Sequence, residues 1–259
     1  MIPGTIIQTW RTAGLPAGAV PLCESWRRCN PDMDYRFFDD EACRRLVAET
    51  APQFLDAWLA LPHAVMRADF FRYAALYRHG GIYADIDMEC VRPVAGLLAL
   101  APVVLGVEAR MTARRQRELG YARPAQIANC MMLAEPGQPF FMEAMARCVE
   151  LAAGQATLER DRIEDVTGPR MLTRLFYERR RPEIAVLRQM VLTPPRHYPD
   201  LWPVNARVHA RHHFFGTWKA AARRPLSRVW VERDRWPNPF GAALLDAELN
   251  GPRGGASRA

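Results

Sequence analysis

One decapeptide, residues 80–89, constrains this chain more than any other segment. It reads Gly-Gly-Ile-Tyr-Ala-Asp-Ile-Asp-Met-Glu, an apolar stretch that leads directly into acidic residues. Side chains alternate between the two faces of an extended strand, so Asp85 and Asp87 are predicted to share one face near the strand's carboxyl end. Two carboxylates this close raise each other's free energy unless a cation or a proton relieves them. A divalent cation shared with a diphosphate would relieve them, because hard cations prefer oxygen ligands.

The Asp-x-Asp pattern by itself is a weak signal. It also fits a solvated turn, or an ion pair between the acids and nearby arginines. The context favours a metal site, because a Gly-Gly helix stop, an apolar strand and the aromatic residue Tyr83 stand directly before the acids.

The rest of the chain alternates strands and helices, which is typical of an α/β fold with a mostly parallel sheet. Strands are expected at 5–8, 35–38, 82–89, 103–107, 127–133, 184–187 and 191–193. Helices are expected at 21–29, 40–50, 52–61, 64–79, 139–153 and 169–179. The polar, arginine-rich segment 108–125 is expected to be an irregular surface loop. In parallel α/β sheets, ligands bind at the carboxyl ends of the strands, which is where Asp85 and Asp87 fall.

Length and composition indicate a globular protein. The 259 residues, 49% of them hydrophobic, suffice for one domain, predicted at 1–245, followed by a disordered tail at 246–259. Six scattered cysteines without a C-x-x-C pair predict reduced, buried thiols. The N-terminus lacks the basic and apolar regions of a signal peptide, so we expect a cytoplasmic protein.

The net charge of +7 is carried almost wholly by arginine. Such a charge suits nucleic acid, anionic lipid headgroups or phosphorylated substrates. The basic clusters at 114–117, 179–181 and 223–224 contain no interleaved aromatic residues. We interpret them as solvated faces, with a membrane-facing or acceptor-facing patch as the alternative. We expect no nucleic-acid partner, and peripheral contact with the inner membrane face.

Three further residues, the pair Asp69 and Arg72 and the single residue Trp10, have both a structural and a functional interpretation. Asp69 and Arg72 lie three residues apart in the helix before the acidic strand and share a helix face. They form either a surface ion pair or a pair directed into the crevice of Asp85, where an arginine can bind a phosphate through two parallel hydrogen bonds. Trp10, at the end of the first strand, is either a core residue or a flat surface for a nucleobase.

A polar and aromatic cluster lies far down the chain. It contains His212, His213, Thr217, Trp218 and Lys219. A histidine there can bind a metal ion, and Thr217 or Lys219 can bind a phosphate; the alternative is a structural role.

Together these segments resemble the glycosyltransferases of family 32, which have a DXD sugar-binding region and include mannosyltransferases related to fungal outer-chain initiation and bacterial capsule enzymes. The strongest resemblance lies in Arg67-Ala68-Asp69-Phe70-Phe71-Arg72-Tyr73 and the strand that follows it. Further similar segments are Ile6-Ile7-Gln8-Thr9-Trp10, Ile127-Ala128-Asn129, Thr167-Gly168-Pro169 and the stretch from His212 to Lys219.

The resemblance implies an A-type glycosyltransferase fold, a Rossmann-like mixed sheet flanked by helices. It implies a nucleotide-sugar donor held through Mn²⁺ or Mg²⁺. The donor-binding residues that it implies are Trp10, Asp69, Arg72, Tyr83, Asn129, Thr217 and Trp218. The catalytic residues would be Asp85, Asp87 and Arg72, and the metal ligands would be Asp85, Asp87 and His213, with His212 as the other candidate histidine.

The reaction implied is the transfer of a hexose from a UDP- or GDP-sugar to a glycan or glycolipid acceptor, with retention of configuration. We expect front-face transfer, in which a donor phosphate oxygen accepts the proton of the acceptor; Glu89 and Glu108 are the other candidate bases.

Two other functions remain as alternatives. A phosphohydrolase would use the first aspartate as a nucleophile, but it needs Thr or Val where Glu89 stands and a downstream Gly-Asp dipeptide, which the chain lacks. A non-enzymatic basic module would bind nucleic acid or lipid, and this function predicts that Asp85→Asn and Asp87→Asn leave binding intact.

Overall fold

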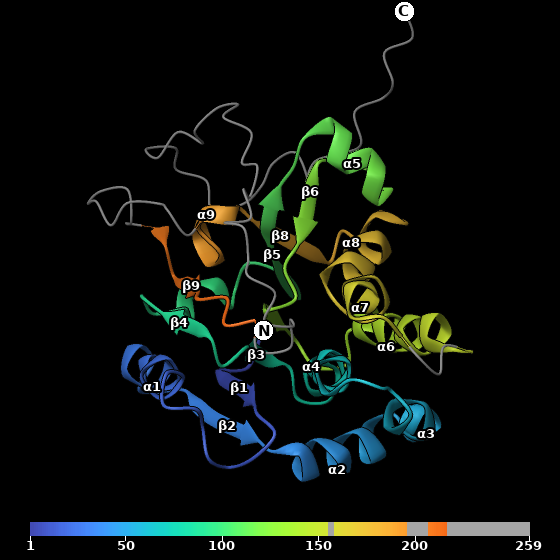
Figure 1. Cartoon of the computed structure of the whole chain (residues 1–259). Helices are drawn as coiled ribbons and strands as arrows, with labels where there is room; N and C mark the ends of the chain where they lie inside the picture. The colour runs from blue at the N-terminus through green and yellow to red at the C-terminus, as the bar shows by residue number, and fades with distance from the viewer. Residues whose placement is uncertain (155–157, 196–206, 217–259) are drawn as a thin grey trace, which may run out of the picture.

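The protein is described by a computed structural model that covers residues 1–154, 158–195 and 207–216. Within these residues a seven-stranded sheet runs through the molecule with helices on both faces (Figure 1). The strands are β1 (Thr5–Thr9), β2 (Asp34–Phe38), β3 (Gly81–Ala84), β4 (Met88–Cys90), β5 (Val103–Arg110), β6 (Ala125–Ile127), β7 (Met131–Ala134), β8 (Ile184–Leu187) and β9 (Ala210–His212). The α-helices are α1 (Val20–Cys29), α2 (Asp40–Thr50), α3 (Leu55–Leu59), α4 (Ala64–His79), α5 (Ala113–Leu119), α6 (Pro139–Ala152), α7 (Ile163–Val166), α8 (Pro169–Tyr177) and α9 (Gln189–Leu192). Single 3-10 turns are η1 (Pro52–Phe54), η2 (Ala95–Leu97) and η3 (Arg160–Arg162).

The large sheet is mixed. Its strand order is β2-β1-β3-β7-β5-β6, and β8 pairs with β5. Strand β1 is parallel to β2 and β3, and β5 is parallel to β8, whereas β7 is antiparallel to both β3 and β5. A separate two-stranded sheet pairs β4 with β9 in antiparallel fashion. The predicted α/β fold with a mixed sheet is confirmed, although β6 and β7 make it less parallel than the alternation of elements alone suggested.

Different helices cover the two faces of the sheet. In β1, Ile7 packs into a core cluster with α2, α4, α6 and α8, while Ile6 packs into a second cluster with α1 and α9. In β3, Tyr83 joins the first cluster, and Ile82 and Ala84 join the second. The alternating side chains of these strands therefore bury both faces, and each large apolar side chain contributes about 1.5–3 kcal/mol.

Two glycines connect α4 to β3. Gly80 ends the helix with a φ of 64°, and Gly81 follows with a φ of 90°, a region that other residues rarely adopt. A Cβ atom on Gly81 would also overlap the carbonyl oxygen of Thr5 in β1. The Gly-Gly pair therefore turns the chain directly from α4 into β3 and lets β3 lie close to β1.

Replacing Gly81 tests this connection. We expect Gly81→Ala to lower the free energy of unfolding by about 2 kcal/mol or more, because the variant combines an unfavourable φ with a steric overlap. Urea unfolding followed by circular dichroism measures the change. The matched control is Gly96→Ala, whose added methyl group has nothing within 4 Å. Equal stability of the two variants would contradict the steric argument.

The segment 108–125 is not the irregular loop that its polar composition predicted. Strand β5 continues to Arg110, helix α5 follows, and β6 begins at Ala125. The side chain of Thr112 caps α5, and Gly120 ends it in the left-handed conformation. These two residues are ordinary helix-boundary signals.

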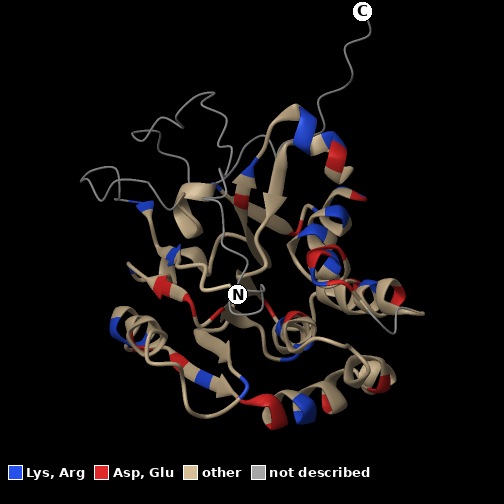
Figure 2. Ribbon diagram, in the orientation of Figure 1, with Lys and Arg blue, Asp and Glu red and all other residues tan. Residues whose placement is uncertain are grey.

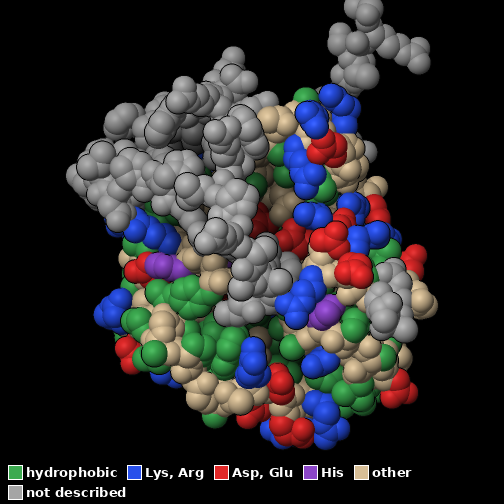
Figure 3. Space-filling model, in the orientation of Figure 1, with side chains coloured by type: hydrophobic (Ala, Val, Ile, Leu, Met, Phe, Trp, Pro, Cys, Tyr) green, Lys and Arg blue, Asp and Glu red, His purple; other side chains and the backbone are tan. Residues whose placement is uncertain are grey.

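Opposite charges lie together on α5. Arg114 and Arg115 both pair with Glu118, at 2.9 and 3.0 Å. At the top of the view, Figure 2 colours both basic and acidic positions on the ribbon of this helix, and Figure 3 shows blue basic and red acidic side chains together there. The interpretation of the 114–117 cluster as a solvated face agrees with these exposed pairs.

Most other helix predictions are confirmed. Asp39 caps α2 by accepting a hydrogen bond from the amide of Ala42 at 2.8 Å. The segment 191–193 was predicted to be extended, but residues 191 and 192 instead end α9, and Thr193 is the C-cap of that helix. All six cysteines are free thiols. None of the helices in the described part of the chain has the length and apolar character needed to cross a bilayer. The tail at 246–259 lies outside the described residues.

Candidate functional site

A cavity of about 330 Å³ opens where β1 and β3 end. It is bordered by the end of β1, the face of α4, the segment between β6 and β7, and the residues that follow β9. The sequence-predicted residues that line it are Trp10, Asp69, Arg72, Tyr83, Asp85, Asp87 and Asn129. Thr217 and Trp218, which were also predicted to bind the donor, lie outside the described residues. The structure therefore brings most of the predicted site together.

The backbone of Asp85 is fixed from both sides. Its amide donates to the carbonyl of Cys130 at 2.8 Å, and its carbonyl accepts from Gln8 Nε2 at 3.1 Å and from the amide of Met88 at 3.0 Å. Gln8 is fully buried and accepts a hydrogen bond from the hydroxyl of Tyr35 at 2.6 Å. The predicted strand 82–89 is therefore interrupted. Strand β3 ends before Asp85, and the chain turns there, held by the hydrogen bond from Gln8 of β1.

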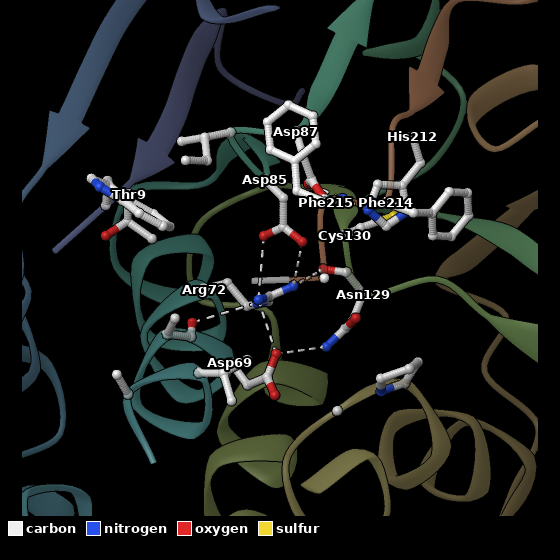
Figure 4. A pocket seen from close by; sticks show the side chains of 18 of the residues that line it. Thr9, Asp69, Arg72, Asp85, Asp87, Asn129, Cys130, His212, Phe214 and Phe215 are labelled. Atoms are coloured by element: carbon white, nitrogen blue, oxygen red, sulfur yellow. Dashed lines mark hydrogen bonds and ion pairs between the residues drawn. The ribbon is translucent and has the colours of Figure 1, made fainter. Parts of the chain in front are cut away.

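Arg72 lies between two aspartates at the centre of the site (Figure 4). Its Nη2 is 2.9 Å from Asp69 Oδ1 and 3.3 Å from Asp85 Oδ1. Its Nη1 donates to the carbonyl of Asn129 at 2.6 Å and lies 3.4 Å from Asp85 Oδ2. The side chain is 4% exposed. Arg72 therefore joins α4 to the end of β3 and to Asn129, while its contact with a phosphate stays a prediction.

Asp69 is held by three partners. Besides Arg72, it accepts hydrogen bonds from Asn129 Nδ2 at 3.0 Å and from Thr167 Oγ1 at 2.8 Å. Burial raises the pKa of Asp69 to about 6, although Arg72, Thr167 and Asn129 each lower it. The pair of Asp69 and Arg72 is thus buried in the crevice, as the functional interpretation required, and is not a surface ion pair.

The two acids of the DXD pattern have different surroundings. The hydroxyl of Tyr83 donates to Asp85 Oδ1 at 2.7 Å. Burial raises the pKa of Asp85, although Arg72 opposes the shift, and Asp87 raises it further. The pKa of Asp87 lies below its usual range because the hydrogen bonds from His212 and from the amide of Phe215 outweigh burial, which raises it. Asp87 is therefore the more readily ionised of the two.

The ladder between β4 and β9 brings a histidine to these acids. His212 stands opposite Met88 in the ladder, and its Nε2 lies 3.3 Å from Asp87 Oδ1. The neighbouring His213 instead places its Nε2 2.9 Å from Glu89 Oε2. His213 was predicted as the third ligand, but the group of possible ligands in the described residues contains His212, the other candidate histidine. Strand β9 ends at His212, so His213 is the first residue after the strand.

The cluster fits a divalent cation. One ligand atom from each of Asp85, Asp87 and His212 can be chosen so that all three lie within 4.8 Å of one another. Nδ1 of His212 is buried and has no hydrogen-bond partner among the described residues, and the ring stacks on Phe214 with centroids 3.9 Å apart. Two carboxylates and an imidazole form a mixed oxygen and nitrogen donor set that suits Mn²⁺ better than Mg²⁺, which prefers oxygen ligands.

Trp10 is partly a core residue and partly a cavity-lining residue, so both interpretations of it hold in part. It is half-buried and packs beside Ala19, Cys23 and Ile86, but it also lines the cavity. The guanidinium carbon of Arg11 lies 4.9 Å from the centre of its ring. The ring is therefore supported by the protein and within reach of a ligand in the cavity.

From the sequence, the roles of Gln8 and Cys130 were not predicted, and Glu108 was considered only as a candidate base. Gln8 and Cys130 fix the backbone of Asp85, and nothing in their local sequence signals that role. Glu108 lines the cavity. Glu89, the other candidate base, is not among the described residues that line the cavity and is bound to His213.

The chain is similar to known glycosyltransferases in sequence. Residues 16–104 match the family described as the glycosyltransferase sugar-binding region containing a DXD motif. The inositol phosphoceramide mannosyltransferase 3 of Schizosaccharomyces pombe is 33% identical over 144 residues, which is 56% of this chain and 36% of that protein. The inositol phosphoceramide mannosyltransferase 2 of the same yeast is 32% identical over 184 residues, which is 70% of this chain and 49% of that protein. The chain spans half or less of the length of these relatives.

The fold is also similar to that of a solved glycosyltransferase. The structure of the PaToxG glycosyltransferase superposes with a TM-score of 0.50 and 17% sequence identity, covering 68% of this chain and 69% of that chain. At this identity the likeness shows the fold alone, and it confirms the predicted A-type glycosyltransferase fold.

Proposed function

Because residues 16–104 of this chain belong to the glycosyltransferase sugar-binding region containing a DXD motif, we propose that the protein transfers a hexose from a nucleotide-sugar to a hydroxyl group of a glycan or glycolipid. The observation that carries the proposal is the cluster of Asp85, Asp87 and His212, which lines one cavity with Asp69 and Arg72. The family match favours this function over a phosphohydrolase and over a non-enzymatic basic module.

The sugar that we propose is mannose, supplied as GDP-mannose. The names of both yeast relatives support a mannosyl donor, since each is called an inositol phosphoceramide mannosyltransferase. The same names support an acceptor that carries hydroxyl groups on a lipid-linked headgroup.

The proposed reaction retains the configuration of the sugar. The C1–O bond to the diphosphate breaks with its electron pair, the acceptor oxygen bonds to C1 from the same face, and the hydroxyl proton passes to a phosphate oxygen of the leaving group. A divalent cation held by Asp85, Asp87 and His212 would offset the charge that grows on the diphosphate. Arg72 keeps Asp69 and Asp85 in place through its ion pairs. Asp69 and Asn129 line the cavity where hydroxyl groups of the donor sugar would bind.

A donor screen tests the proposal. The release of nucleoside diphosphate is measured from GDP-mannose, UDP-glucose, UDP-galactose and UDP-N-acetylglucosamine, with Mn²⁺, with Mg²⁺ and with EDTA. We expect turnover of GDP-mannose with Mn²⁺ and none with EDTA. If only a UDP-sugar is turned over, GDP-mannose is not the donor. Turnover that persists in EDTA would contradict the metal site.

Trp10 is expected to bind the nucleobase. Trp10→Ala should weaken the binding of GDP in the presence of Mn²⁺ by about 1–3 kcal/mol, or roughly 5- to 150-fold in Kd, because a base-stacking surface is lost. Isothermal titration calorimetry measures the change. Trp10→Phe keeps an aromatic surface and is the matched control. If Trp10→Ala binds GDP as tightly as Trp10→Phe, the stacking role is excluded.

We also propose that the protein acts in the cytoplasm with peripheral contact at the inner membrane face, where a glycolipid acceptor would be presented. The net charge of +7 supports attraction to anionic lipids. Cosedimentation with vesicles that contain or lack anionic lipid tests this location; equal sedimentation with both would contradict an electrostatic contact.

A further inference from the structure

Glu108 occupies a bulge in β5. Val107 pairs with Ile127 of β6, but Ala109 pairs with the adjacent Gln126, so Glu108 is the extra residue on the β5 side. Bulges bend a strand and redirect a side chain, and they are common beside active sites. The residues of β5 before Glu108 are buried, and Glu108 is the first that is partly exposed. Strand β5 therefore leaves the core at Glu108, which lines the cavity.

Two hydrogen bonds in series hold the carboxylate of Glu108. Gln126 Nε2 donates to Glu108 Oε2 at 2.7 Å, and the hydroxyl of Tyr121 donates to Gln126 Oε1 at 2.9 Å. The bond from Tyr121 orients the amide of Gln126, so that its NH₂ group faces the carboxylate. On the backbone, the carbonyl of Glu108 accepts from Gln189 Nε2 at 2.9 Å. Gln126 of β6, Gln189 of α9 and Tyr121, which follows α5, thus position Glu108 at the cavity.

Three of the other acids that line the cavity, Asp69, Asp85 and Asp87, already have partners or form the metal cluster. Asp85 and Asp87 form the metal cluster with His212, and Asp69 is held by Arg72, Asn129 and Thr167. A further carboxylate beside a diphosphate would repel it, since like charges in a low-dielectric site disfavour each other. A carboxylate is instead a strong acceptor for the hydroxyl groups of a neutral sugar.

We propose that Glu108 binds the acceptor sugar. Its carboxylate accepts a hydrogen bond from a hydroxyl group of a neutral hexose and thereby holds the attacking oxygen near C1 of the donor. The hydroxyl proton still passes to the leaving phosphate oxygen, so Glu108 stays ionised. Gln126 and Tyr121 are positioning residues that act through Glu108. This inference rests on the proposed glycosyltransferase function.

The test separates acceptor binding from donor binding. The enzyme is assayed with GDP-mannose, Mn²⁺ and methyl α-D-mannopyranoside as the acceptor probe. We expect Glu108→Gln to lower kcat/KM for this acceptor by about 10- to 100-fold, which corresponds to the loss of one charged hydrogen bond. Hydrolysis of GDP-mannose without acceptor, and the Kd of GDP with Mn²⁺, should stay within about twofold of wild type.

Two further variants sharpen the result. Tyr121→Phe should raise the KM of the acceptor by about 2- to 10-fold with kcat nearly unchanged, because Glu108 remains but Gln126 loses the hydrogen bond that orients its amide. This variant still tests the inference if Glu108→Gln does not fold. Glu89→Gln is the matched control, because it removes the charge of a glutamate that lies outside the described cavity lining, and it should leave both activities unchanged.

Each other outcome overturns the inference. If Glu108→Gln loses transfer and hydrolysis to the same extent, Glu108 contacts the donor and not the acceptor. If transfer is unchanged, Glu108 does not bind the acceptor. A wild-type enzyme that hydrolyses GDP-mannose but does not transfer to methyl α-D-mannopyranoside would exclude a neutral hexose acceptor. A wild-type enzyme that neither binds GDP with Mn²⁺ nor hydrolyses GDP-mannose would refute the proposed function itself, and the role of Glu108 would fall with it.

Discussion

Asp87→Asn is expected to reduce the turnover of GDP-mannose by about 1,000-fold or more. Asp87 is the acid of the cluster whose pKa is lowered, and it is the one that His212 contacts directly. An amide at this position removes one anionic ligand, and a catalytic cation supplies several kcal/mol of transition-state stabilisation, where about 4 kcal/mol corresponds to this factor. Initial rates of GDP release at saturating Mn²⁺ measure the loss.

The same variant should abolish the part of GDP binding that depends on Mn²⁺, which calorimetry measures separately. Glu89→Gln serves as the control, because Glu89 follows the DXD pattern closely in sequence but contacts His213. It should retain activity within about threefold. An Asp87→Asn enzyme with wild-type turnover would refute the metal site, and intact metal-dependent binding would favour the non-enzymatic alternative.

Arg72→Leu is expected to lower the free energy of unfolding by about 3–5 kcal/mol at pH 8. The guanidinium contacts both Asp69 and Asp85 and is almost fully buried, so its removal leaves the buried carboxylate of Asp69 and the partly buried carboxylate of Asp85 without their cation. Urea unfolding at constant ionic strength measures the loss. Arg114→Leu is the matched control, since Arg114 is 86% exposed and pairs with Glu118 on the surface. That variant should show little change.

The loss of unfolding free energy in Arg72→Leu, relative to wild type, should become smaller as the pH falls. Burial raises the pKa of Asp69 to about 6 even though Arg72 lowers it, so the variant's pKa should lie higher still. In the unfolded chain the carboxyl has its usual pKa near 3.8. Above the folded pKa, the folded variant must hold an ionised carboxylate that lacks its guanidinium partner, which costs stability. As the pH falls through the folded pKa, the carboxylate takes up a proton and this cost is lost. The difference from wild type should therefore be smaller at pH 5 than at pH 8, and an equal difference at both would contradict the account.

The sequence predicted the parts of the site that local signals control. Helix α4 and strand β3 follow from apolar periodicity and from Gly80-Gly81, and their adjacency brings Asp69 and Arg72 to the end of β3. The helix α5 was missed because its arginine-rich surface suggested a loop, although Thr112 and Gly120 mark its ends. That error came from giving composition more weight than boundary residues.

The rest of the site depends on contacts between distant residues. His212 faces Asp87 because of the β4–β9 register, and the sequence alone does not show which of the two neighbouring histidines faces the acids. Gln8 reaches the carbonyl of Asp85 across 77 positions of the chain. The bulge at Glu108 exists only in the pairing of β5 with β6. Local pattern carries no information on these registers.

A crystal grown with GDP and Mn²⁺ tests the central claim most directly. Anomalous scattering from manganese would locate the ion without reference to the protein. We expect one peak in the cavity, bound by Asp87 and His212, with Asp85 and the diphosphate oxygens completing the site. A peak between Glu89 and His213, or bound GDP with no manganese at the DXD pattern, would contradict the account.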